Sequence, residues 1–180
     1  MQNNHLFVLT GGPGSGKTTV LLALEKHGFT FAREVARQII QEQVQAGGTA
    51  LPWLDTQLYT RLMLERSIEG YRQNTPTSAP RFSDRGIPDT LCYARLIGLA
   101  DDEFIRQACG RYRYASPVFI APPWPEIYQT DSERKQTFAE AVRTHEQMSA
   151  VYRDCGYELV ELPKLPPEGR AGFIMSWLRL

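Results

Sequence analysis

Residues 11 to 18 bring together the residue types that hold the phosphates of a nucleotide. They read Gly-Gly-Pro-Gly-Ser-Gly-Lys-Thr and satisfy the pattern of a glycine, four residues and then Gly-Lys-Thr. Glycines permit tight bends that aim several backbone N–H groups at one anion, and a helix N-terminus adds partial positive charge. Lys17 is placed to reach the β- and γ-phosphates, and the Thr18 hydroxyl to ligate Mg²⁺. We therefore expect ATP and Mg²⁺ as cofactors, with the nucleotide contacted by Gly11, Gly12, Pro13, Gly14, Ser15, Gly16, Lys17, Thr18 and Thr19.

Two common classes of phosphate-loop protein lack their signatures in this chain. A guanine-specific GTPase of the Ras type needs an Asn-Lys-x-Asp tetrapeptide, and none of Asn3, Asn4 and Asn74 begins one. An AAA+ machine needs four apolar residues followed by Asp-Glu on a strand, whereas Asp102-Glu103 lies at a predicted helix start. The phosphate loop alone does not identify the reaction. With these two classes lacking their motifs, a small-molecule kinase agrees best with the sequence.

Such a kinase needs charged side chains at the ends of neighbouring strands. Glu34 follows the expected second strand and is a candidate to orient or deprotonate an accepting hydroxyl; a plain helix N-terminal acid is the structural alternative. Asp84 ends the expected third strand and is a candidate Mg²⁺ ligand with Thr18; a turn or N-cap aspartate is the alternative. Arg85 points to the same cleft, where it would hold acceptor or phosphate, or else form a surface ion pair.

A lid with cations is the third part of such a site, because charge on the transferring phosphoryl group must be neutralised. A proline-containing loop and the start of the next helix, about residues 122–135, fit this role by position. Arg134 is the candidate cation, with Lys135 beside it, and Arg111 and Arg113 could approach from the preceding helix. For each of these a solvated surface position is the alternative.

The acceptor should bind between the helix after the second strand and the Asp84-Arg85 segment. Trp53 and Tyr93 could stack on a base or a pyridine ring, although packing is the more common role of such residues. The acceptor-pocket candidates are Arg37, Trp53, Gln57, Arg61, Asp89 and Tyr93.

Apolar runs alternate with amphipathic segments along the chain, which predicts a parallel sheet covered by helices. We expect strands at residues 5–10, 29–32, 81–84, 117–121 and 157–162. We expect helices at residues 17–27, 34–45, 54–71, 89–99, 101–112, 131–154 and 168–180, with Asp101 as an N-cap.

Composition is that of an ordinary soluble globular protein, with 42% hydrophobic and 22% charged residues and a formal net charge of zero over 180 residues. This fits one domain, residues 1–180, and gives no indication of a nucleic-acid surface. The three cysteines lack metal-ligand spacing, so we expect them to pack in the core in a reducing compartment. No signal peptide or membrane span is expected, and the cytoplasm is the expected location.

Several segments resemble a known family. Besides residues 11–19, they are Arg-Glu-Val-Ala-Arg at 33–37, Ser-Asp-Arg-Gly-Ile-Pro-Asp-Thr-Leu-Cys-Tyr at 83–93, Val-Phe-Ile-Ala-Pro-Pro at 118–123 with Tyr128, Asp131 and Arg134, and Gly-Tyr-Glu-Leu-Val-Glu-Leu-Pro at 156–163. Together they look like the AAA-type ATPase domain family related to the ribosylnicotinamide kinase domain of the bacterial NAD-biosynthesis regulator.

The resemblance covers nearly the whole chain and implies a three-layer α/β/α P-loop NTPase, nucleoside- and nucleotide-kinase-like, with a five-stranded parallel sheet. It also implies that the adenine rests near Pro163 in the loop after the fifth strand. Glu-Val-Ala-Arg is similar to the second-strand motif of deoxynucleoside kinases, in which the glutamate acts as base, and this favours Glu34.

Two functions remain open on these grounds. The first is ATP- and Mg²⁺-dependent phosphoryl transfer to a small hydroxyl-bearing, nucleoside-like metabolite. The second is a nucleotide-dependent switch or binding protein with slow hydrolysis and no small-molecule acceptor. The resemblance does not fix the acceptor.

Overall fold

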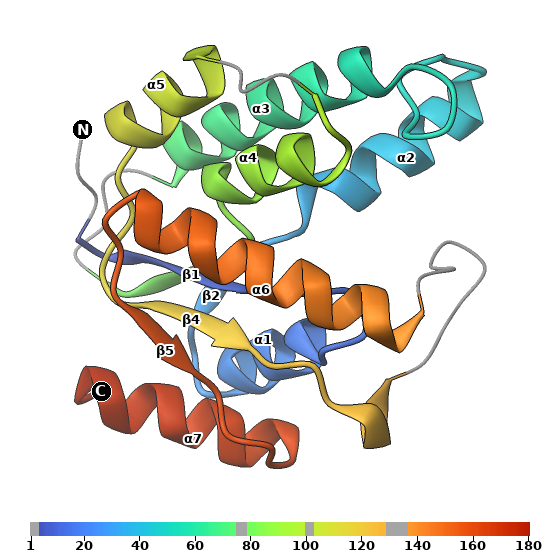
Figure 1. The fold of residues 1–180 in the computed structure, drawn as a ribbon. Coiled ribbons are helices and arrows are strands. Elements are labelled where there is room, and N and C mark those ends of the chain that lie inside the picture. Colours follow the sequence, from blue (N-terminus) through green and yellow to red (C-terminus); the bar gives the residue numbers. More distant parts are fainter. Residues whose placement is uncertain (1–3, 75–78, 100–102, 129–136) are drawn as a thin grey trace.

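The computed structural model describes residues 4–74, 79–99, 103–128 and 137–180 (Figure 1). Its strands are β1 (Leu6–Gly11), β2 (Thr30–Ala32), β3 (Arg81–Asp84), β4 (Val118–Ala121) and β5 (Leu159–Glu161). Its helices are α1 (Lys17–Lys26), α2 (Val35–Ala46), α3 (Thr56–Gln73), α4 (Ile87–Leu96), α5 (Glu103–Arg111), α6 (Phe138–Asp154) and α7 (Pro167–Leu178), with a 3-10 turn, η1 (Pro125–Ile127).

The five described strands form one sheet in the order β2-β3-β1-β4-β5, and each recorded pair is parallel. Helices α1 and α7 lie on one face, and α3, α4 and α6 lie on the other (Figure 1). This confirms the expected three-layer α/β/α fold with a five-stranded parallel sheet. Strand β1 is central, so the loop that follows it opens at the carboxyl edge between β3 and β4, where parallel α/β sheets bind ligands.

Each face of the sheet has its own hydrophobic core. Because successive side chains of a strand point to opposite faces, Leu6 and Val8 of β1 pack with α3 to α6. Phe7 and Leu9 pack on the other face with α1 and α7. All six residues of β1 are buried, which explains its uninterrupted apolar run.

The expected helix boundaries are correct to within a few residues, with one larger error. The helix expected from residue 131 begins at Phe138, because Thr137 and Glu140 form a capping box that fixes the first turn. The helix expected from Asp89 begins earlier, at Ile87, because the Asp89 side chain instead accepts from the Gly86 N–H and caps the helix. The expected N-cap Asp101 lies outside the described residues.

Cys92 and Cys109 are buried in the core and Cys155 is half-buried, all three as free thiols. In the described ranges, no helix has both the length and the apolar character that spanning a bilayer would require.

Candidate active site

The phosphate loop joins the end of β1 to the first turn of α1. Gly11 has φ 141°, and a Cβ there would lie 2.7 Å from the Ala121 carbonyl oxygen of β4. Gly16 caps α1 with the left-handed φ of 81°. Both positions therefore require glycine for geometric reasons. The Ser15 hydroxyl donates to the Gly12 carbonyl at 2.7 Å and braces the turn from within.

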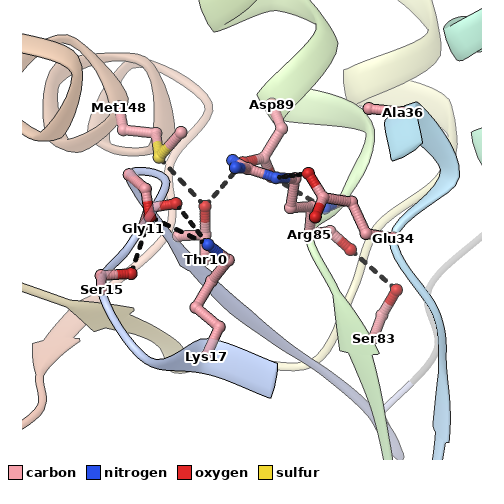
Figure 2. A network of polar contacts seen from close by, with 12 residues as sticks. Thr10, Gly11, Ser15, Lys17, Glu34, Ala36, Ser83, Arg85, Asp89 and Met148 are labelled. Atoms are coloured by element: carbon pink, nitrogen blue, oxygen red, sulfur yellow. Dashed lines mark hydrogen bonds and ion pairs between the residues drawn. The ribbon is translucent and has the colours of Figure 1, made fainter. Parts of the chain in front are cut away.

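Lys17 is held inside this loop. Its Nζ donates to the carbonyl oxygens of Gly11 at 2.9 Å and Gly12 at 3.0 Å (Figure 2). Burial lowers the pKa of the ammonium to about 8, and the nearby charge of Arg85 acts in the same direction. A buried cation with two neutral acceptors is suited to an anionic ligand. The Thr18 hydroxyl is on an exposed residue beside it.

Asp84 lies at the end of β3, in register with Leu9 of β1. Its side chain is buried, and its Oδ1 has no hydrogen-bond partner among the described residues. Burial raises the pKa of this carboxyl, while the Lys17 charge opposes the rise. An orphaned carboxylate oxygen at this edge fits a hard cation such as Mg²⁺, with Thr18 as a second ligand.

The described residues contain no group of three or more His, Cys, Asp or Glu that could hold a metal ion by itself. This is compatible with Mg²⁺ bound through one or two protein ligands and substrate phosphates.

Arg85 connects two carboxylates at the carboxyl edge of the sheet. Its Nε donates to Glu34 Oε1 at 2.8 Å, and its Nη1 donates to Asp89 Oδ1 at 3.1 Å (Figure 2). Burial opposes the charge of the guanidinium, but Glu34 and Asp89 outweigh burial and raise its pKa. The Arg85 backbone has φ 73°, a conformation that costs a non-glycine residue about 1–2 kcal/mol. Such strain at a charged cluster is typical of functional sites.

Asp89 receives hydrogen bonds from three further groups. The Thr10 hydroxyl donates to its Oδ1 at 2.6 Å. The Gly86 N–H and the Tyr152 hydroxyl donate to its Oδ2 at 2.8 Å and 2.5 Å. Burial, followed by the Asp89 charge, raises the pKa of Tyr152 well above its ordinary value.

A cavity of about 270 Å³ lies over this cluster and reaches the phosphate loop at Pro13. Tyr59 and Tyr93 meet edge to face in its wall, with ring centroids 5.5 Å apart. The lining residues are Pro13, Glu34, Ala36, Arg37, Ile40, Pro52, Tyr59, Met63, Arg85, Asp89, Cys92, Tyr93, Leu96, Thr144 and Met148.

Three of the acceptor-pocket candidates, Arg37, Asp89 and Tyr93, line this cavity, and three do not. Trp53 is 63% exposed, and Gln57 and Arg61 line a different cavity of about 1090 Å³ between α3, α4 and α5. Tyr59 was missed, although it lies one helical turn beyond Asp55 on a segment expected to be helical. Tyr59 and Met63 are four residues apart, so they lie on the same face of the helix, and this pattern could have identified Tyr59 as a buried residue.

Arg111 and Arg113 are not brought to the expected lid. Arg111 lines the larger cavity between α3 and α5. Arg113 lies over the Tyr157 ring at 4.0 Å and donates to the carbonyl oxygens of Cys155 and Gly156. Arg111 ends α5 and Arg113 follows it toward the amino end of β4, whereas the phosphate loop lies at the carboxyl edge. Arg134 and Lys135 lie outside the described residues, so their role stays a prediction.

Arg170 is a site residue that sequence reasoning missed. It is 1% exposed, donates from Nε to the Pro163 carbonyl at 2.9 Å and from Nη1 to the Ser15 carbonyl at 2.8 Å. Its guanidinium lies 4.9 Å from the centre of the Trp124 ring, and its Nη2 has no hydrogen-bond partner within the described part of the chain. A cation in the first turn of α7, where the helix dipole disfavours it, is the signal that could have drawn attention to it.

Comparison with known proteins places this geometry among phosphate-loop folds. A family model described as AAA domain matches residues 6–170, whereas no curated protein matches the chain. The structure of a NadR protein in complex with NR superposes with a TM-score of 0.75 at 16% identity, covering 99% of this chain and 52% of that one. The chain thus spans about half the length of that NadR chain.

Two shorter kinases have the same fold. Thymidylate kinase from Ehrlichia chaffeensis gives a TM-score of 0.62 at 18% identity and covers 99% of this chain and 100% of that one. Shikimate kinase from Acinetobacter baumannii in complex with shikimate gives 0.56 at 16% identity and covers 97% and 92%. At such identities the likeness establishes the shared fold.

Proposed function

Since this chain belongs to the AAA domain family, we propose that it is an ATP- and Mg²⁺-dependent kinase of a small hydroxyl-bearing, nucleoside-like metabolite. The family resemblance expected from the sequence is thereby confirmed, but family membership alone does not fix a reaction. The proposal therefore rests on the residues of the site. We treat residues 1–180 as one nucleotide-binding domain.

The observation that carries the proposal is a cavity in which the phosphate loop and a carboxylate face the same space. Pro13, Glu34 and Arg85 all line the cavity of about 270 Å³. Small-molecule pockets are typically about 300–1,000 Å³, and this cavity of about 270 Å³ lies just below that range, which suits a small metabolite. Phosphoryl transfer needs such a space beside the phosphate loop, whereas a slow hydrolytic switch needs room only for water.

The aromatic wall favours a planar ring on the acceptor. Tyr59 and Tyr93 both line the cavity, and a ring on the ligand could pack against either one in an offset-stacked or edge-to-face arrangement. The charged end of the cavity, at Glu34 and Arg85, would then receive the hydroxyl-bearing part. A nucleoside-like compound has this division into a planar and a hydroxylated part.

Each charged residue has a distinct role in this reaction. Lys17 and the loop N–H groups hold the phosphates, and Thr18 and Asp84 would hold Mg²⁺, which would supply positive charge against the phosphates. Glu34 orients the acceptor hydroxyl and takes its proton as the hydroxyl oxygen bonds to the γ-phosphorus and ADP departs. Arg85 fixes Glu34 and adds positive charge, and Arg134 would add charge from the lid region of about residues 122–135. Pro163 would rest beside the adenine.

The surroundings we propose follow from the same features. Free cysteines, two of them buried, are typical of proteins of a reducing compartment. This supports the cytoplasm, where ATP is plentiful. A net charge of zero gives no basis for nucleic-acid binding.

Phosphoryl transfer from γ-labelled ATP to a panel of nucleosides and small hydroxylated metabolites tests the proposal. We expect one class of acceptor to become labelled. Glu34→Gln should lower kcat by about 10²- to 10⁴-fold, the usual contribution of a general base, with the Kd for ATP unchanged. Glu42→Gln is the matched control on α2, because Glu42 is exposed and pairs only with Arg66 among its recorded partners.

Slow phosphate release with no labelled acceptor would instead identify a switch. Full turnover of Glu34→Gln would remove Glu34 from the mechanism.

A further inference from the structure

The hydrogen-bonding capacity of the Asp89 carboxylate is fully used within the protein. An ionised carboxylate offers about four acceptor positions on its two oxygens. Oδ1 accepts from Thr10 and Arg85, and Oδ2 accepts from Gly86 and Tyr152. Asp89 is also only 5% exposed. Although it borders the cavity, its carboxylate has no acceptor position left for a ligand hydroxyl.

The donors to Asp89 come from separate parts of the fold. Thr10 belongs to β1, Gly86 precedes α4, and Tyr152 lies on α6, and Thr10 and Tyr152 are both fully buried. Hydrogen bonds to a charged group are stronger than those between neutral groups. Three fixed donors therefore hold the carboxylate rigidly in place before any ligand binds.

The strained residue of the site depends on this carboxylate. Arg85 keeps a left-handed backbone, φ 73°, while its guanidinium spans from Asp89 to Glu34. Asp89 accepts from three additional donors, and its side chain is 4% exposed, compared with 18% for Glu34. It is therefore the fixed point from which Arg85 reaches Glu34 (Figure 2).

We infer that Asp89 is a positioning residue, locked by Thr10, Gly86 and Tyr152, which fixes Arg85 and through it the proposed base Glu34. The inference rests on the proposed function for the role of Glu34. It also links the two halves of the site, because Thr10 immediately precedes the phosphate loop at Gly11. The orientation of the base is thus tied to the strand that carries the phosphates.

Tyr152→Phe tests the inference by removing one donor without touching the cavity. Tyr157→Phe is the matched control, because Tyr157 is a buried tyrosine that packs on Tyr152 and whose hydroxyl accepts from the Tyr114 N–H. We expect Tyr152→Phe to lower kcat about tenfold, as loss of a supporting hydrogen bond does elsewhere, with the KM for ATP unchanged. Tyr157→Phe should change kcat less than about twofold.

A double variant separates positioning from general loosening of the fold. If Tyr152 acts through Glu34, Tyr152→Phe lowers kcat no further in a Glu34→Gln background, because residues that act as a unit are non-additive. A full additional loss of about tenfold in that background would overturn the inference.

A measurement without turnover distinguishes this inference from the proposed function. We expect solvent exchange of the Arg85 Nε–H, followed by ¹⁵N NMR, to become at least about tenfold faster in Tyr152→Phe and to stay unchanged in Tyr157→Phe. If the wild-type protein labels no acceptor, the proposed function fails and this measurement alone decides the positioning role. Unchanged exchange in a folded Tyr152→Phe protein would overturn it.

Discussion

The two halves of the site are built in opposite ways. The proposed phosphate-binding half is one continuous stretch, residues 11–19, which would hold phosphates mainly through backbone N–H groups. The proposed acceptor half consists of charged side chains, Glu34, Arg85 and Asp89, which come from the segments that begin α2 and α4. Glu34 and Arg85 are 51 positions apart in the chain, yet their side chains meet at 2.8 Å.

Because the charges of the two halves are held differently, we expect one half to matter mainly for ligand binding and the other mainly for the stability of the fold. In the phosphate half, Lys17 is a buried cation held by two carbonyl oxygens, and burial lowers its pKa to about 8. A cation in that state adds little to the stability of the free protein. In the acceptor half Arg85 is a cation shared by two largely buried carboxylates, so removing it takes that positive charge away from both Glu34 and Asp89. Changes in the two halves should therefore affect different observables.

The largest effect on stability is expected from Arg85→Gly. Removing one partner of a buried ion pair costs about 3–5 kcal/mol, while glycine recovers about 1–2 kcal/mol of left-handed strain. We expect the free energy of unfolding, measured in urea, to fall by about 1–4 kcal/mol on this balance. Turnover should fall at least as far as in Glu34→Gln, because Glu34 loses its fixed partner.

Arg179→Gly is the control, since Arg179 also has a left-handed backbone, φ 56°, but is exposed at the end of α7. Its stability should stay within about 1 kcal/mol of the parent. Equal effects of the two substitutions would show that the ion pairs of Arg85 add nothing to stability.

Lys17→Met should show the reverse pattern. Methionine keeps much of the length of the side chain and removes the charge that faces the phosphates. We expect the Kd for ATP, measured by calorimetry, to rise about 100-fold, equivalent to about 2.7 kcal/mol. The free energy of unfolding should change by less than about 1 kcal/mol. A large loss of stability with unchanged ATP binding would contradict the contrast between the two halves.

The smallest effect is expected from Arg170→Lys, which tests a tertiary contact of the phosphate loop. Lysine keeps the charge but loses the planar group that joins the Ser15 and Pro163 carbonyl oxygens beside Trp124. We expect the Kd for ATP to rise about tenfold, because the phosphate loop and the proposed adenine loop are no longer tied together. The KM for the acceptor should stay unchanged. An unaltered Kd in the folded variant would make Arg170 a packing residue.

Elements with local signals were predicted well from the sequence. β3 has the expected bounds, Arg81–Asp84, and α1 begins at Lys17 as expected. The predicted start of α6 was wrong. The sequence ahead of Thr137 favours a helix, but the capping box of Thr137 and Glu140 sets the first turn at Phe138. The packing role expected of the cysteines fits the burial of Cys92 and Cys109.

The acceptor half was less accessible to sequence reasoning. Trp53 was a reasonable stacking candidate by type, but it follows Pro52 in a turn that leaves it in solvent. Asp89 was expected among the acceptor contacts, whereas its carboxylate is occupied by four donors. A residue type indicates what a side chain is able to do, and its neighbours in space decide what it does.

The sequence by itself determined the phosphate loop, because residues 11–19 are consecutive and a turn is governed by local backbone geometry. It also determined the parallel α/β architecture, since alternating strands and helices leave few other ways to bury their apolar faces. Only the tertiary structure decided which charges meet. Thr10 and Asp89 are 79 positions apart, and a separation of that length in the sequence does not tell how far apart two residues lie in space. Their hydrogen bond exists because β1, α4 and α6 pack around one buried carboxylate, and the free energy of that burial is what selects its partners.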